Sequence, residues 1–154
     1  MKTYKAMLPE IKLRYENTNE NKVKISSSKD AFQLLVKLYD DDTIEYTETV
    51  IVLFMNRANN TIGWFKLSTG CTSCAMVDSK VLFATALKCG ASALILSHNH
   101  PSGFTHPSEP DRKLTSRVLE CGKLLEISVL DHLIITKQNY YSFADDGQMI
   151  RKYG

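Results

Sequence analysis

Hydrophobic and polar positions change along the chain in segments of helix and strand length. Apolar residues recur at helical spacing after Ser26–Ser28 and stop at the acidic turn 40–42, which predicts a first helix. From Ile44 to Met55 the sequence is rich in β-branched and apolar residues, as is typical of a strand buried on both faces. Turn residues at 57–60 then predict a hairpin with a second strand at 61–67.

The second half alternates helices and strands. A helix is predicted over 78–88, closed by Gly90, and its expected inward positions are Val81, Leu82, Ala84, Thr85 and Leu87. A further helix is expected near 111–121, with Gly122 as its stop. Strands are predicted on either side of it, at 91–97, 127–136 and 140–143. This order predicts an α/β or α+β fold with helices packed on a central sheet.

Composition and charge fit a single domain. A chain of 154 residues, 44% apolar and 23% charged, has room for one core and excludes a disordered or coiled-coil protein. The net charge of +2 is too small to predict nucleic-acid or anionic-membrane binding by its field alone. No apolar run is long enough for a secretory signal or a membrane span, so the sequence predicts a cytoplasmic protein with free thiols and no membrane partner.

The segment after the strand at 91–97 carries the candidate chemistry. His98 and His100 are two residues apart at a strand end, so both imidazoles point to one side. Asp111 follows eleven residues later, and a tight loop would bring its carboxylate to the histidines. Three protein ligands with one open position are the arrangement of catalytic zinc. Ser108 and Asp111 also fit a helix capping box, which would hold the Asp111 carboxylate toward the imidazoles.

His98-x-His100, seven residues, Ser108, two residues and Asp111 resemble the JAMM motif of the JAB/MPN metalloprotease superfamily. The strings SHNHPSG, PSEPD and DHLII resemble its RadC branch, over about residues 44–143. The resemblance implies a JAB/MPN-like fold with a central mixed sheet flanked by helices. It also implies an arm and first helix at 1–43 and a RadC-like metal-binding domain at 44–154, within one domain.

The resemblance implies a zinc hydrolase of peptide or isopeptide bonds. His98, His100 and Asp111 would bind Zn²⁺, Glu48 would be the general base, and Ser108 would hydrogen-bond the developing oxyanion. Glu45 is the competing acid, but Glu48 opens the apolar run ETVIVLFMN, where a lone acid is costly without a partner. A peptide or protein substrate is expected, of unknown identity.

Two other functions compete with hydrolysis. A zinc deaminase would need H-x-E and P-C-x-x-C, which this chain lacks. A non-catalytic DNA-repair or partner-binding module is the main alternative, because RadC proteins are associated with repair. RadC proteins usually carry a helix-hairpin-helix segment ahead of this domain, and the first 43 residues are too short and polar to supply it. DNA is therefore a partner by family association only.

Several other residues have plainer interpretations. Asn99 should point to the opposite face as a structural residue, and His106 should be an exposed loop residue. Asp131 and His132 are interpreted as a satisfied structural pair in a buried strand. The lone C-x-x-C of Cys71 and Cys74 is interpreted as fortuitous, because a zinc ribbon needs a second pair.

Overall fold

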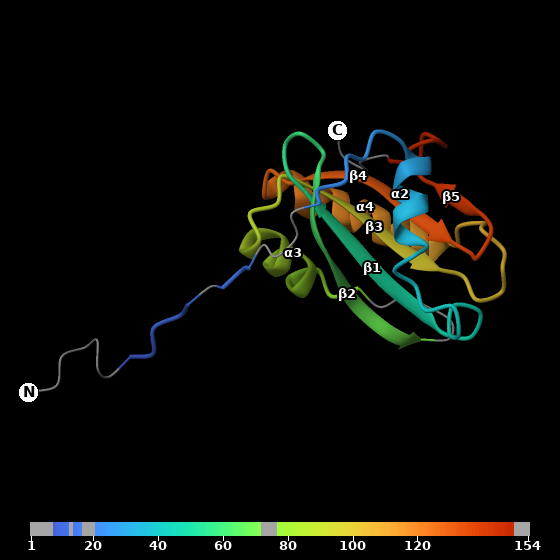
Figure 1. Ribbon diagram of the computed structural model, residues 1–154, viewed down its shortest axis with the longest axis horizontal. Coiled ribbons are helices and arrows are strands. Elements are labelled where there is room, and N and C mark those ends of the chain that lie inside the picture. Colours follow the sequence, from blue (N-terminus) through green and yellow to red (C-terminus); the bar gives the residue numbers. More distant parts are fainter. Residues whose placement is uncertain (1–7, 13, 17–20, 72–76, 150–154) are drawn as a thin grey trace, which may run out of the picture.

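A five-stranded mixed sheet with helices on both faces forms the body of the protein (Figure 1). The computed structural model describes residues 8–12, 14–16, 21–71 and 77–149. Its elements, in chain order, are α2 (Ser28–Leu35), β1 (Glu48–Met55), β2 (Thr61–Cys71), α3 (Ser79–Lys88), β3 (Ala93–Asn99), α4 (Glu109–Leu124), β4 (Ser128–Ile135) and β5 (Tyr140–Ser142). Among the helices described, none is long and apolar enough to cross a membrane. The predicted fold class is confirmed.

The strand order is β2-β1-β3-β4-β5, with β3 and β4 parallel and the other neighbours antiparallel. β1 therefore runs against β3 in the middle of the sheet, and Val50 pairs with His98. This register brings the first residue of β1, Glu48, to the same end of the sheet as the last residues of β3. Because side chains alternate along a strand, Glu48 and His98 share one face of the sheet.

Each face of the sheet has its own hydrophobic cluster. Leu53 of β1 and Ile95 of β3 pack against α2 on one face, together with Ala31 and Leu35 of that helix. Val52 of β1 and its neighbours on the other face pack against α3 and α4. All eight residues of β1 are buried, as predicted for a strand covered on both sides. Glu48, His98 and Asp111 lie on the α3/α4 side.

The first strand begins at Glu48 and not at Ile44 as predicted. Residues 43–47 form turns instead, with backbone hydrogen bonds from Tyr46 and Thr47 to the Thr43 carbonyl. Asn99 stabilises this turn: its amide donates to the carbonyls of Ile44 and Thr47, and its oxygen accepts the Thr49 N–H. Apolar composition alone could not indicate where these tertiary hydrogen bonds end the strand.

The predicted inward face of α3 is confirmed at Leu82 and wrong at the other positions. The buried residues are Leu82, Phe83 and Ala86, whereas Val81 and Leu87 are exposed. Residues 81–87 are apolar nearly all round the helix, so periodicity could not orient it. Packing against the sheet decides which face of α3 is buried. Gly90 follows the helix with a φ of 67°, as predicted for the residue that closes it.

Gly122 does not stop α4, which continues to Leu124. A Cβ at this buried glycine would lie 2.6 Å from the Ile127 carbonyl oxygen and 2.8 Å from Cγ2 of Val129. The glycine is therefore needed for close packing of the helix on the following chain, and not for a helix end. Sequence position alone does not separate these two uses of glycine.

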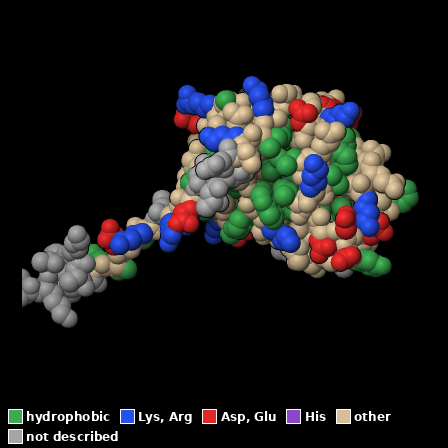
Figure 2. Space-filling view, in the orientation of Figure 1, with side chains coloured by type: hydrophobic (Ala, Val, Ile, Leu, Met, Phe, Trp, Pro, Cys, Tyr) green, Lys and Arg blue, Asp and Glu red, His purple; other side chains and the backbone are tan. Residues whose placement is uncertain are grey.

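The outer strand β2 is less covered than the rest of the sheet. Its Trp64 pairs with Leu53 and so lies on the α2 face, where half of its surface remains exposed. Figure 2 shows hydrophobic side chains gathered on this face beside α2. The helix therefore covers only the inner strands of that face.

Candidate metal centre

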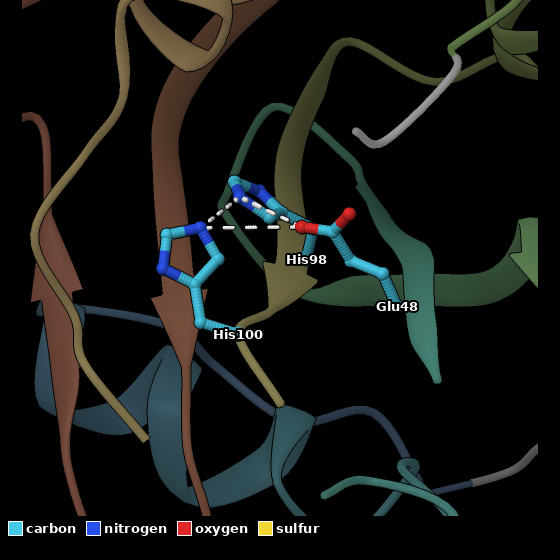
Figure 3. A group of neighbouring side chains, drawn as sticks. All are labelled: Glu48, His98 and His100. Atoms are coloured by element: carbon cyan, nitrogen blue, oxygen red, sulfur yellow. Dashed lines mark hydrogen bonds and ion pairs between the residues drawn. The ribbon is translucent and has the colours of Figure 1, made fainter. Parts of the chain in front are cut away.

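Four polar side chains from three elements meet at one end of the sheet. Glu48 begins β1, His98 lies near the end of β3, His100 follows that strand, and Asp111 lies in the first turn of α4. Figure 3 shows Glu48, His98 and His100 pointing toward one another. The crossover from β3 to α4 brings Asp111 to the same place.

The distances fall into two groups. The Nε2 atoms of His98 and His100 are 3.1 Å apart, and the Asp111 carboxylate oxygens lie 3.2 Å and 3.3 Å from them. Oε1 of Glu48 is more distant, at 4.0 Å from each Nε2. Asp111 and the imidazoles thus form a tight triangle, with Glu48 set back from it.

The capping box of α4 fixes Asp111. The Ser108 hydroxyl oxygen accepts the Asp111 N–H at 3.2 Å, and Oδ2 of Asp111 accepts the Ser108 N–H at 2.9 Å. The carboxylate is buried and acts both as a cap and as the neighbour of the two histidines. The two interpretations of Ser108 and Asp111 in the sequence therefore coexist.

Hydrogen bonds on the outer nitrogens orient both imidazoles. Nδ1 of His100 lies 2.8 Å from the Phe104 carbonyl oxygen, which can only accept, so this nitrogen carries the hydrogen. Nδ1 of His98 lies 2.8 Å from Nε2 of His132. Both rings therefore present Nε2 to the centre, and partners of this kind on the outer nitrogen are typical of metal-binding histidines.

Glu48 is a buried carboxylate with one unpaired oxygen. It is 8% exposed, and Oε2 makes no hydrogen bond in the part of the chain that the structure describes. Burial raises the pKa of Glu48, and the nearby imidazoles only partly offset this effect. A carboxylate of this kind is costly unless it has a function or a further partner.

The charges of Asp111 and His100 support each other. Burial would raise the pKa of Asp111, but its hydrogen bonds to His100 and His98 outweigh burial and lower it. Burial would lower the pKa of His100, but hydrogen bonds to Asp111 and the Phe104 carbonyl outweigh it and raise the pKa. Without a further cation, the ionised Asp111 carboxylate therefore favours positive charge at the neighbouring imidazole of His100.

The donor set fits a divalent metal ion. Glu48, His98 and His100 each offer one ligand atom, and these atoms all lie within 4.8 Å of one another, so the group could hold a metal. Nitrogen and oxygen ligands about 2.0–2.2 Å from a tetrahedral zinc lie roughly 3.3 Å apart. The spacings of 3.1–3.3 Å among His98, His100 and Asp111 match that value.

The remaining predicted residues lie as follows. Ser108 is exposed at the helix N-cap beside the centre. Glu45 is outside it, in an ion pair with Lys137 at 3.4 Å. His106 is exposed, as predicted. Cys74 and the side chain of Cys71 lie outside the described residues, whereas Cys89 and Cys121 are free thiols.

Sequence reasoning missed the contact between His132 and His98 and did not consider Thr115. The His132 ring is not paired with the Asp131 side chain but contacts His98, and Thr115 contacts that ring at 2.6 Å. Thr115 lies one helical turn after Asp111, and that spacing was a readable signal. The position of His132 depends on the parallel register of β3 and β4, which the sequence did not reveal.

The fold and the centre together define a domain of mixed α and β structure with a group of side chains that could hold a metal ion. Comparison with family models then identifies it: the chain belongs to the RadC-like JAB domain family, whose model matches residues 25–148. The predicted family is thus confirmed.

Curated relatives carry the name UPF0758 protein. One from Flavobacterium johnsoniae is 42% identical over 124 residues, 80% of this chain and 53% of the relative. One from Histophilus somni is 45% identical over 100 residues, 65% of this chain and 45% of the relative. One from Staphylococcus haemolyticus is 35% identical over 133 residues, 86% and 57% of the two chains. The chain spans about half the length of these relatives.

Proposed function

We propose that this chain is a zinc-dependent hydrolase of the JAMM type that cleaves a peptide or isopeptide bond. The observation that carries the proposal is the set-back carboxylate of Glu48. It is buried, its pKa is raised, and one of its oxygens has no hydrogen-bond partner among the residues that the structure describes. It faces two imidazoles whose Nε2 atoms converge with Asp111. If Glu48 served only in a structural ion pair, both of its buried oxygens would be expected to have hydrogen-bond partners.

His98, His100 and Asp111 would hold the zinc ion. Their mutual spacing supports this assignment, and the 4.0 Å distances of Glu48 leave it free for another role. Zinc bound there supplies a Lewis acid and lowers the pKa of water to about 7. This assignment differs from a Glu48–His98–His100 ligand set, which the geometry also permits.

Glu48 would act as the general base and then as the general acid. Its carboxylate accepts a proton from the water that attacks the carbonyl carbon, and returns it to the leaving amine nitrogen. A carboxylate whose pKa is raised by burial holds that proton better than an exposed one, and so suits both steps.

Ser108 would stabilise the oxyanion that develops on the carbonyl. As the helix cap, its oxygen accepts the Asp111 N–H, which leaves the hydroxyl hydrogen available for donation. The side chain is exposed at the mouth of the centre, where a substrate carbonyl could reach it. One such donor typically contributes about 10²–10³ in rate.

The substrate is proposed to be a peptide or protein. A role in DNA repair and a cytoplasmic location stay predictions, the first by family association and the second from the sequence. The alternative, a non-catalytic binding module, is separated from the hydrolase by the experiment that follows.

Glu48→Gln tests the proposal, with His100→Ala as its partner variant. We expect near-stoichiometric zinc by elemental analysis in the wild-type protein and in Glu48→Gln, and loss of zinc in His100→Ala. Hydrolysis of a peptide and isopeptide library should be lost in both variants, since one lacks the base and the other lacks the metal.

Different results would point elsewhere. Wild-type protein that takes up no zinc when zinc is offered would overturn the metal assignment. Zinc loss in Glu48→Gln would make Glu48 a ligand. Equal cleavage by wild type and Glu48→Gln would exclude Glu48 as the base, and zinc binding without any cleavage would favour the binding module.

A further inference from the structure

A chain of hydrogen bonds connects α4 to His98 through residues outside the JAMM motif. The Thr115 hydroxyl donates to the Asp111 carbonyl oxygen at 2.9 Å, and its oxygen lies 2.6 Å from Nδ1 of His132. Nε2 of His132 lies 2.8 Å from Nδ1 of His98. The chain thus runs from the backbone of one candidate ligand to the imidazole of another.

Donor and acceptor chemistry fixes the direction of every step. The Asp111 carbonyl can only accept, so it takes the single hydroxyl hydrogen of Thr115. The Thr115 oxygen can then only accept from His132, so Nδ1 of His132 carries a hydrogen. In a neutral His132 ring, Nε2 is then the acceptor for the hydrogen on Nδ1 of His98.

The surroundings hold this chain rigid and favour a neutral His132. The His132 ring is 1% exposed and stacks on Phe143, with centroids 4.7 Å apart and planes within 5°. His98 and Thr115 are also buried, at 0% and 2% exposed. Burial of the ring in this stack favours its uncharged form. Water has little access to exchange partners along the chain.

We infer that Thr115 and His132 are positioning residues that keep a hydrogen on Nδ1 of His98, as in the tautomer that offers Nε2 to a metal ion beside Asp111 and His100. This inference rests on the proposed function for its metal, but the tautomer itself is a property of the chain alone. The same bonds connect β3, β4 and α4, and so keep the separation of His98 and Asp111 constant. Outer partners of this kind typically contribute 10–100-fold to metal affinity.

Thr115→Val tests the inference, with Thr115→Ser as the matched control. Valine has the shape of threonine without the hydroxyl, so the fold should be retained while Nδ1–H of His132 loses its acceptor. His132 is then free to carry its hydrogen on Nε2, which would leave the outer nitrogen of His98 as the acceptor. Serine keeps the oxygen and should keep the chain of hydrogen bonds.

Two measurements follow on these variants. The first is the Kd for Zn²⁺ alone, by competition with a chelator: we expect a loss of about tenfold or more in Thr115→Val and no change in Thr115→Ser. The second is the protonation of the His132 ring nitrogens by long-range ¹H–¹⁵N NMR, with and without zinc. The chain has four histidines, so single variants assign the signals.

We expect Nδ1 of His132 to be protonated and Nε2 to be bare in the wild type and in Thr115→Ser, whether or not zinc is bound. A hydrogen on Nε2 of wild-type His132 would overturn the inference, as would an unchanged zinc Kd in Thr115→Val. If the wild type binds no zinc, the proposed function fails, and the spectrum of the zinc-free protein still decides the tautomer. Zinc binding without cleavage leaves both measurements valid.

Discussion

Asp131 and His132 are neighbours on β4 whose side chains serve different purposes. The His132 ring faces α4 and contacts His98, whereas the Asp131 carboxylate accepts hydrogen bonds from the Ser142 hydroxyl and the backbone N–H groups of Ala144 and His132. One step along a strand changes the face, so two adjacent polar residues need not form a pair. Both residues are satisfied by hydrogen bonds, as predicted, but their two side chains do not bond to each other.

Asp131→Asn should become increasingly more stable than the wild type as the pH rises from about 4. Burial raises the pKa of Asp131 despite its hydrogen bonds, so the folded protein prefers the protonated carboxyl. The contribution of Asp131 to the free energy of unfolding of the wild type is therefore fully present below the unfolded pKa of about 3.9. It is lost as the pH rises through the higher pKa of the folded protein. Asparagine does not titrate, and its oxygen can still accept both N–H groups.

The difference in free energy of unfolding between wild type and Asp131→Asn, measured by urea titration from pH 4 to 7, checks this expectation. Asp131→Ala is the control: it removes all three hydrogen bonds and should cost about 1–3 kcal/mol across the range. A difference between wild type and Asp131→Asn that is flat with pH, or that favours aspartate more at higher pH, would contradict the sign.

At the scale of elements, the start of α4 combines a helix cap with the candidate centre. Ser108 and Asp111 exchange two hydrogen bonds, and the same carboxylate approaches both imidazoles. The N-terminus of α2 has a similar cap, in which the Ser27 hydroxyl oxygen accepts the Asp30 N–H at 3.1 Å. The two helices pack on opposite faces of the sheet, so α2 provides a cap without a centre.

Ser108→Ala and Ser27→Ala should therefore cost similar stability but differ in zinc binding. Each loses one cap hydrogen bond, worth about 1 kcal/mol. Only Ser108→Ala loosens the turn that carries Asp111, so its zinc Kd should rise by up to about fivefold, the factor that 1 kcal/mol represents. Urea titration of zinc-free protein and chelator competition measure the two effects. A rise in zinc Kd of similar size in Ser27→Ala would show that general destabilisation is the cause.

At the scale of the whole molecule, the two hydrophobic clusters of the core contain none of the side chains of the candidate metal centre. The clusters on the two faces of the sheet are built from apolar side chains of all three helices and the inner strands. The centre lies at one end of this sheet, between the start of β1, the end of β3 and the start of α4. Metal binding should thus add to the stability of a protein that already folds.

Zinc at about 100 times its Kd should stabilise the folded protein by about 2.7 kcal/mol. For a domain of this size, the gain should raise the Tm by about 5–10 °C over protein in chelator. Thermal unfolding with and without zinc measures the shift. His100→Ala is a suitable control, since its side chain is 16% exposed and its removal leaves both clusters intact. Its Tm should not respond to zinc, and a chelated wild type that is unfolded at 25 °C would contradict the expectation.

Local sequence patterns were enough to predict the order of helices and strands and the candidate ligands. Local patterns are sufficient for these: β1 is apolar on both faces, His98 and His100 follow a period of two, and Ser108 with Asp111 forms a cap over three residues. Glu48 was predicted from the resemblance to RadC proteins, and the cost of a lone acid in an apolar strand was a second reason. The structure places Glu45 outside the centre, in an ion pair with Lys137. Contacts within one element or one turn depend on neighbours in sequence, which can be read directly.

Which distant residues contact the centre became known from the three-dimensional fold. The inward face of α3 and the close approach at Gly122 depend on packing between elements, which an apolar helix or a single glycine does not encode. The place of His132 beside His98 depends on a parallel strand register, set by the whole sheet and its crossover helix. The candidate ligands could therefore be predicted from the sequence, whereas the contacts of His98 with distant residues became visible only in the fold.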